Sequence, residues 1–378
     1  VYFVALLGYG ATIFDGAGPA AWDDFKSHIL LHRTFLGFPP NNDPEGSQLG
    51  ALKATIAHEY FHAIQLAYDG TDDLWLHEST ATYKENRVFP QTDDNFQFLQ
   101  YYYNDPDTFL TASSGNKQYG SFVWPEYVTA VYGDSVMRRL WEELRFADGV
   151  TTYDIALAPH STTIAKEFRK FTLWNFFSGD RIAPGYFTDG ASYPGIVFDS
   201  PLPTPPFAGV TAAKPPDGLA TNYRSLALSG APGGVLKLDF AGVNNVSWGL
   251  NLIFRDTLGD YEVIQLSVPL SGLKSFTRYN YNKWDTLFVA PAVTSPWLNN
   301  NSYSLTATVF PHGDADASGA VNIADVTYLL AYIFTSGPEP PYDPLLGDAD
   351  CSERLNINDV TYLIATIFSG GPLPCAGE

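Results

Sequence analysis

Apolar residues recur every three or four positions between residues 49 and 67, which is the spacing of one face of an α-helix. An Asp-Pro pair precedes this stretch and an Asp-Gly pair follows it, so the pattern predicts a helix from about residue 44 to residue 68. His58 and His62 lie away from the centre of the stripe, and we expect them to line a cleft. The stripe consists of Leu49, Leu52, Ile56, Tyr60, Ala63 and Ala67.

The first 200 residues predict a mainly helical α+β domain. A Thr-Asp-Asp cluster is typical of a helix cap and precedes a second helical pattern, and two further helical patterns follow. Short apolar runs near the N-terminus predict strands. The helices are expected at 75–85, 120–146 and 161–178, and the strands at 1–10 and 27–35.

Residues 201–217 are rich in proline, and this composition predicts a linker. From residue 218 to residue 311, short apolar stretches alternate with Gly, Asn and Pro, which is typical of an all-β sandwich. The strands are expected at 234–240, 248–254, 261–268, 286–293 and 303–309. Trp248, Trp284 and Trp297 offer a carbohydrate-binding role for this domain, although packing in the core or rim is the commoner use of such residues.

The segment HEYFH, from His58 to His62, carries the candidate catalytic chemistry. Residues four apart on a helix share one face, so both histidines can reach one zinc ion while Glu59 faces a water molecule on that ion. A catalytic zinc site uses three protein ligands and one open position, and Glu78 on the next predicted helix supplies the third ligand. Buried, hydrogen-bonded core histidines are the alternative interpretation.

This pattern resembles the gluzincin metallopeptidases, in which a W-L-x-E-x-x-A segment after HExxH supplies the third zinc ligand. The chain leaves 15 residues between the second histidine and the glutamate, fewer than the two best-known branches of that clan. A closer resemblance is to secreted bacterial metallopeptidases with A-H-E-[FY]-F-H-A-[IV]-Q, W-x-x-E-[SA]-x-A and Y-G-x-F-x-x-x-x-Y segments. The matching segments here are 57–65, 75–81 and 119–127.

The resemblance implies one catalytic Zn²⁺ and hydrolysis of peptide bonds by a metal-activated water. Glu59 is then the general base, and Tyr119 is the candidate donor to the developing oxyanion. We expect an endopeptidase, with an aminopeptidase as the second choice.

The last 67 residues, 312–378, contain two acidic segments 34 residues apart, each followed by a similar helical pattern. Their polar residues fall at the ligand positions of a calcium loop. The duplication resembles a type I dockerin, which implies two structural Ca²⁺ ions, a small α-helical domain and a cohesin partner, as in polysaccharide-degrading complexes. The implied ligands are Asp314, Asp316, Ser318, Ala320, Asn322 and Asp325 in the first loop, and Asp348, Asp350, Ser352, Arg354, Asn356 and Asp359 in the second.

Two features of the dockerin-like region depart from a regular pair of loops. Glu353 stands in the second loop where the first has Gly319, at a position that usually needs a positive φ, so weaker calcium binding is expected there. Both cysteines of the chain, Cys351 and Cys375, flank the last predicted helix, and a disulfide is the simplest interpretation of that placement.

Charge and composition exclude some classes of partner. A net charge of −20 argues against nucleic acid. The first ten residues lack the basic leader and cleavage site of a signal peptide and are too few to span a membrane. Because the chain does not start with Met, we expect upstream sequence to have been removed, and we predict a secreted or cell-surface bacterial protein.

His28 and His32 also stand four positions apart, but they belong to the predicted strand 27–35, where such residues lie too far apart to share one metal. As a hypothesis, this strand is an edge that aligns a peptide substrate by added-strand pairing.

The sequence therefore predicts a zinc metallopeptidase domain (1–200), a linker (201–217), a β-sandwich (218–311) and a dockerin (312–378). The alternative is a dockerin-anchored adhesion or scaffold protein with an inactive protease-like domain. A glycoside hydrolase is a third possibility, since such enzymes commonly carry a dockerin, but no carboxylate pair in the chain explains the helical domain as well as HExxH with the following glutamate does.

Overall fold

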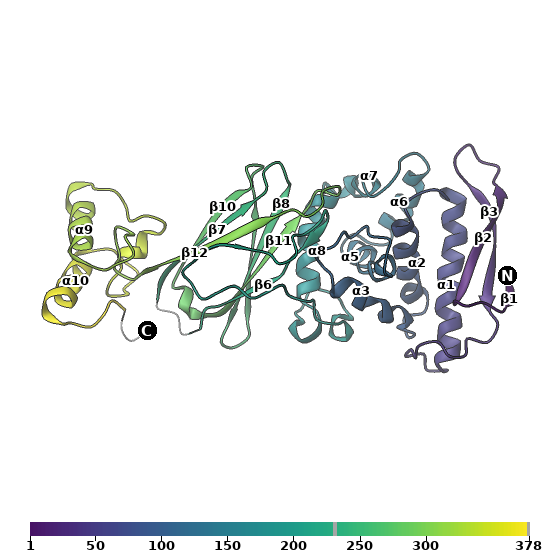
Figure 1. Cartoon of the computed structure of the whole chain (residues 1–378), viewed down its shortest axis with the longest axis horizontal. Helices are drawn as coiled ribbons and strands as arrows, with labels where there is room; N and C mark the ends of the chain where they lie inside the picture. The colour runs from purple at the N-terminus through teal and green to yellow at the C-terminus, as the bar shows by residue number, and fades with distance from the viewer. Residues whose placement is uncertain (230–232, 376–378) are drawn as a thin grey trace. The chain divides into compact units, whose positions relative to one another are not determined.

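The computed structural model describes residues 1–229 and 233–375. The chain divides into two compact units, each described here by itself (Figure 1). Unit 1 comprises Val1–Val197, Pro216–Thr221 and Ala292–Asn299, and unit 2 comprises Phe198–Pro215, Asn222–Pro291 and Asn300–Glu378. Within the described ranges, no helix is both long enough and apolar enough to cross a bilayer.

Unit 1 begins with a three-stranded sheet of β1 (Tyr2–Val4), β2 (Gly10–Ala17) and β3 (Phe25–His32). The order is β1-β3-β2, with β1 parallel and β2 antiparallel to β3. The strand expected near residues 27–35 is therefore present, but the hypothesis that it is an edge was wrong. Strand β2 pairs along the length of β3, and β1 pairs with its last three residues, Leu30–His32, so β3 is the central strand and these residues have no free side for a peptide.

Helix α1 (Ser47–Tyr68) lies between this sheet and α2 (Leu74–Val88), as Figure 1 shows. The close approach of β2 to α1 requires a glycine, because a Cβ on Gly10 would lie 2.7 Å from Thr55 Cγ2. Helix α1 begins three residues later than expected. The Asp43 carboxylate instead holds the preceding turn by accepting hydrogen bonds from Glu45 N (2.8 Å) and Lys53 Nζ (2.9 Å).

The predicted apolar stripe of α1 is not its main buried face. Leu52 and Ala63 pack partly against an apolar cluster that includes Ile29 and Leu31 of β3, but Ile56 is 37% exposed and Tyr60 is 65% exposed. The most buried positions of α1 are small or polar, because the helix packs closely against neighbours on two sides. These positions are Gly50, Ala51, Ala54, Thr55, Ala57, Glu59 and Gln65.

The rest of unit 1 is mainly helical, around a core of large aromatic side chains. Trp124 and Tyr127 from α5 pack with Phe168 and Phe171 from α8, and all four are fully buried. The remaining helices are α3 (Leu99–Tyr103), α4 (Lys117–Gly120), α5 (Val123–Tyr132), α6 (Ser135–Leu144), α7 (Thr152–Leu157) and α8 (Ile164–Phe176), with 3₁₀ turns at Asp94–Phe98, Ala158–His160, Gly179–Arg181 and Gly190–Ser192.

Unit 2 contains a β-sandwich, as the short apolar strands predict. One sheet has the order β10-β7-β12-β4, and in the other β11-β8-β9 are neighbours, with β6 also paired to β11. The facing sheets meet through aromatic pairs, with Phe240–Trp248 ring centroids 5.3 Å apart and Phe254–Phe276 centroids 6.0 Å apart. The strands of the two sheets are β4 (Phe207–Thr211), β6 (Arg224–Ala227), β7 (Gly234–Gly242), β8 (Trp248–Asp256), β9 (Tyr261–Ser267), β10 (Leu273–Tyr279), β11 (Trp284–Val293) and β12 (Tyr303–Pro311), with a 3₁₀ turn at Tyr281–Lys283. The short strand β5 (Ala220–Thr221) belongs to unit 1.

Two details of the sandwich differ from the expectation. Strand β4 lies inside the segment 201–217 and pairs with β12, so this proline-rich stretch contributes to a sheet. Strand β10 was not expected, because its polar residues interrupt the apolar pattern along the sheet edge. Trp248 is buried in the core, whereas Trp297 is 65% exposed.

The C-terminal part of unit 2 is built from two similar halves. Helices α9 (Ile323–Thr335) and α10 (Ile357–Ser369) each begin at an asparagine that forms a capping box with an aspartate three residues later. A 3₁₀ turn at Pro344–Gly347 precedes the second half. The two halves share one small apolar core of Ala315, Val326, Leu329, Ala349, Val360 and Leu363.

Candidate functional site

The structure brings the three predicted zinc ligands together on the facing sides of α1 and α2. His62 Nε2 lies 2.9 Å from His58 Nε2 and 3.4 Å from Glu78 Oε2, and His58 Nε2 lies 3.2 Å from the same carboxylate oxygen. Ligands held about 2.0–2.1 Å from one zinc ion in a tetrahedron lie about 3.3 Å from each other. The three observed separations therefore fit a single small cation.

The other nitrogen of each ring faces an acceptor. His58 Nδ1 lies 2.8 Å from Glu85 Oε1, and His62 Nδ1 lies 2.6 Å from Gln65 Oε1. In a neutral imidazole one nitrogen carries the proton, and here that nitrogen is Nδ1 in both rings. Both Nε2 lone pairs then point at each other and at the Glu78 carboxylate, and a proton or a metal cation between them would remove the repulsion.

A proton and a metal ion compete for this position. Burial alone would lower the pKa of His58, yet the hydrogen bonds to the carboxylates of Glu78 and Glu85 outweigh it and raise that pKa to about 10. Burial opposes ionisation of Glu78, but its bonds to His58 and His62 hold its pKa well below the usual range. The site thus favours positive charge, which either a proton or a metal cation supplies.

Glu59 and Tyr119, the two predicted catalytic residues, lie beside this cluster. Glu59 is buried on α1, and its Oε2 accepts a hydrogen bond of 2.8 Å from the Thr12 hydroxyl on β2. The Tyr119 ring lies 6.2 Å from the His58 ring and stacks on Phe98 at 5.0 Å. Burial, followed by the negative charges of Glu78 and Glu59, raises the pKa of Tyr119 to about 12, so its hydroxyl remains a donor at neutral pH.

Sequence reasoning missed the partners of the histidines. Gln65 follows His62 by three positions, and Glu85 follows Glu78 by seven. Each spacing places the residue on the same helix face as the predicted ligand before it, so the sequence could have identified both partners. Burial raises the pKa of Glu85 to about 7. His77 lies between the site and Trp141, with its Nδ1 3.2 Å from Gln65 Oε1, and burial lowers its pKa to about 4.

The two acidic loops of unit 2 each gather three carboxylates whose oxygen atoms lie within 4.8 Å of one another. In the first loop, Asp314 accepts hydrogen bonds from Ser318 N and Gly319 N, both at 2.9 Å, and Asp325 Oδ2 accepts from Asn322 N at 2.8 Å. These bonds turn the chain around the three carboxylates. The trio is Asp314, Asp316 and Asp325.

The second loop repeats this geometry with Asp348, Asp350 and Asp359. Asp348 accepts from Ser352 N at 3.1 Å and Glu353 N at 2.9 Å. In both loops burial, with a contribution from nearby negative charge, raises the pKa of the last aspartate, Asp325 or Asp359, to about 6. Crowded carboxylates of this kind are suited to a hard cation with oxygen ligands such as Ca²⁺.

The position-7 residues of the loops, Ala320 and Arg354, provide backbone carbonyls within each turn. Ala320 O accepts from Asn322 Nδ2 at 2.9 Å, and Arg354 O accepts from the Ser352 hydroxyl at 3.3 Å. Both carbonyls are thus held by polar side chains of their own loop.

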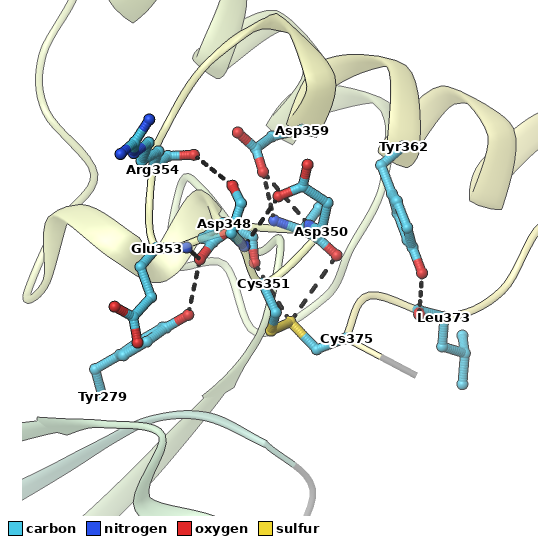
Figure 2. The surroundings of a disulfide bond; sticks show 12 residues. Tyr279, Asp348, Asp350, Cys351, Glu353, Arg354, Asp359, Tyr362, Leu373 and Cys375 are labelled. Carbon is cyan, nitrogen blue, oxygen red and sulfur yellow. Dashed lines mark hydrogen bonds between the residues drawn. A yellow bond between two sulfur atoms is a disulfide. The ribbon is translucent and has the colours of Figure 1, made fainter. Parts of the chain in front are cut away.

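Figure 2 shows the contacts that Cys375 and Tyr279, which lie outside the second acidic loop, make with residues of that loop. Cys351, between Asp350 and Ser352, forms a disulfide with Cys375, and Cys375 N donates to Ala349 O at 3.0 Å. The Tyr279 hydroxyl donates to Asp348 Oδ2 at 3.0 Å. The C-terminal segment and β10 therefore both contact the second loop.

Comparison with known proteins identifies one family model, described as a family of unknown function (DUF6055), which matches residues 47–170. This range contains the histidine cluster, Glu78, Glu85 and Tyr119. No curated protein matches the chain significantly.

Solved structures with local likeness include the Yersinia pseudotuberculosis-derived mitogen, at 19% identity and a TM-score of 0.22, covering 27% of this chain and 84% of that one. The pre-peptidase C-terminal domain of a Bacillus anthracis collagenase is 8% identical with a TM-score of 0.22, covering 30% and 97% respectively. A family 16 carbohydrate-binding module is 12% identical with a TM-score of 0.19, covering 28% and 89%. Likenesses this weak do not indicate a function for the chain.

Proposed function

We propose that unit 1 is a zinc-dependent peptidase in which His58, His62 and Glu78 hold the metal. The observation that carries the proposal is the convergence of His58 Nε2, His62 Nε2 and Glu78 Oε2 within 2.9–3.4 Å, while the Nδ1 nitrogens face acceptors. When bound, zinc lowers the pKa of water and polarises a carbonyl group.

The chain's own residues supply the remaining steps. Glu59, held by Thr12, takes the proton of the attacking water and passes it to the leaving amine. The Tyr119 hydroxyl donates a hydrogen bond to the oxygen of the scissile carbonyl as negative charge develops there. Endopeptidase activity is the first expectation, and aminopeptidase activity is the second.

We also propose that the C-terminal part of unit 2 is a calcium-dependent dockerin that binds a cohesin domain. Its two helices expose equivalent apolar side chains 34 positions apart, including Phe334 at 64% and Phe368 at 66% exposure. Apolar residues exposed at matching places on a small domain are typical of a protein-binding surface. The disulfide fits a secreted or cell-surface bacterial protein, since such bonds persist in oxidising compartments.

Glu59→Gln tests the peptidase directly. The variant should bind one zinc per chain, as the wild type does, but lose hydrolysis of a generic protein substrate, because an amide cannot accept the proton. The matched control is Glu45→Gln, which changes an exposed carboxylate that pairs with Lys53 outside the site. Hydrolysis by Glu59→Gln at the wild-type rate would contradict the mechanism.

The metal content separates this proposal from its alternative. A wild-type protein that holds zinc but hydrolyses no peptide would favour the dockerin-anchored adhesion or scaffold protein with an inactive protease-like domain. A wild-type protein without zinc would refute the metal site itself.

A further inference from the structure

The two histidines of the metal site are held by a hydrogen-bond network that reaches across α1 and α2. His58 Nδ1 meets the Glu85 carboxylate at 2.8 Å, and His62 Nδ1 meets Gln65 Oε1 at 2.6 Å. Gln65 is fully buried and Glu85 is 5% exposed, so water does not replace either acceptor easily.

The orientation of the Gln65 amide is fixed by its nitrogen. Gln65 Nε2 donates to the His77 backbone carbonyl at 2.9 Å and to Thr80 Oγ1 at 2.8 Å. Thr80 Oγ1 donates its own hydrogen to the Leu76 carbonyl at 2.7 Å, so it can act towards Gln65 only as an acceptor. A flipped amide would place an oxygen against two acceptors, which leaves Oε1 as the atom that faces His62.

We propose that Glu85 and Gln65 are positioning residues that fix the tautomer and ring orientation of His58 and His62, with Thr80 locking the Gln65 amide. This inference rests on the metal site of the proposed function. Helix α2 thus contributes one proposed ligand, Glu78, and two positioning residues. Glu85 orients His58, and Thr80 fixes the amide of Gln65. Each neutral ring then keeps its proton on Nδ1, and both Nε2 atoms are aimed at one point where a metal ion can bind.

Zinc affinity of the full chain, measured by competition with a chromophoric chelator, tests the proposal without relying on activity. Glu85→Met and Gln65→Met keep side-chain length but remove the acceptor, and each should lower zinc affinity by about 10- to 100-fold. Glu85→Gln keeps an acceptor oxygen and should retain more affinity than Glu85→Met. The absorption spectrum of the Co²⁺-loaded variants should shift as the imidazoles rotate.

Two threonines on α2 allow a smaller substitution to be tested against a matched control. Thr80→Val removes the acceptor that locks Gln65 and should weaken zinc binding and alter the Co²⁺ spectrum. Thr82→Val is the control, because Thr82 is equally buried and its hydroxyl has no hydrogen-bond partner among the described residues. Thermal melting of the metal-free proteins shows whether each variant is folded.

The outcomes distinguish this inference from the proposed function. If the wild type binds zinc and the two methionine variants, shown to be folded, bind it as tightly, the positioning role is refuted while the metal site stands. Equal losses in Glu85→Gln and Glu85→Met, or in Thr80→Val and Thr82→Val, would also refute positioning through these hydrogen bonds. A wild type that takes up no zinc would overturn both proposals.

Discussion

At the scale of single residues, the surroundings of Tyr119 determine the chemistry that its side chain can perform. Its hydroxyl is kept protonated because burial, aided by nearby carboxylates, raises its pKa to about 12. A tyrosine that stays neutral can donate a hydrogen bond to an oxyanion throughout the physiological pH range. The ring itself is held by stacking on Phe98.

Tyr119→Phe should therefore keep zinc and lower kcat by about 100- to 1,000-fold, as for the loss of one oxyanion donor. KM should change little, because the hydrogen bond strengthens in the transition state. Steady-state peptidase kinetics and a zinc count check this prediction. A matched control is Tyr60→Phe, which alters a largely exposed tyrosine of α1, and equal kinetics for the two variants would count against the role.

Glu353 carries backbone strain at the turn of the second acidic loop. It adopts a φ of 57°, whereas the equivalent Gly319 adopts 90° without a side chain. Glu353→Gly should stabilise the calcium-free second loop by about 1 kcal/mol, since a left-handed conformation costs an L-residue roughly that much.

Calorimetric titration with calcium should then show tighter binding at the second loop of Glu353→Gly. Gly319→Ala is the mirror control and should weaken the first loop, because a Cβ is introduced at positive φ. Unchanged titrations in both variants would show that the turns do not limit binding.

At the scale of elements, the stability of the acidic loops and of the helices that follow them should depend on pH. Burial raises the pKa of Asp325 and Asp359 to about 6 in the calcium-free protein, above the value of about 3.9 in an unfolded chain. The folded calcium-free loops therefore bind protons more tightly than the unfolded chain does. Their contribution to stability is full below about pH 4 and is lost as pH rises through about 6.

Calcium reverses this dependence, because it requires ionised carboxylates. Calcium affinity should fall by about tenfold per loop for each pH unit below 6, as one proton competes at each site. Calorimetry at pH 5.0 and 7.5 measures the affinity, and thermal melting with and without calcium measures the stability. A calcium affinity that does not change with pH would contradict the placement of these aspartates as ligands.

The arrangement of elements also explains why the hypothesis that β3 is an edge strand was wrong. A strand pattern predicts that residues 27–35 are extended, but not which strands lie beside them. Pairing with both β1 and β2 places β3 in the centre of its sheet. The strand that does contact the site is β2, through Thr12 and Glu59.

At the scale of the whole molecule, the candidate zinc site and the two candidate calcium loops belong to different compact units. The zinc chelator 1,10-phenanthroline should abolish hydrolysis while leaving calcium-dependent cohesin binding intact. Conversely, Asp314→Ala combined with Asp348→Ala should abolish calcium uptake and cohesin binding while hydrolysis continues, because these residues lie in unit 2. Peptidase and binding assays on one preparation check both outcomes, and loss of both activities in either experiment would contradict separate metal sites.

Local patterns in the sequence determined much of this protein. HEYFH lies on a helix because its periodicity and flanking turn residues act within a few positions. The duplicated acidic loops follow in the same way from the spacing of their polar residues. Glu78 could be added because its surrounding motif places it on the next helix. The sandwich strands were predictable where apolar runs are continuous, and β10 was missed where polar residues interrupt them.

Only the tertiary structure decided the features that depend on distant neighbours. The exposure of Ile56 and Tyr60 follows from the close packing of α1 against both the sheet and α2, which favours small residues at the contacts. The pairing of His58 with Glu85, 27 positions away, and the contact of Thr12 with Glu59, 47 positions apart, depend on how separate elements pack. Periodicity identifies the face on which a side chain lies, but packing selects the atom that it meets.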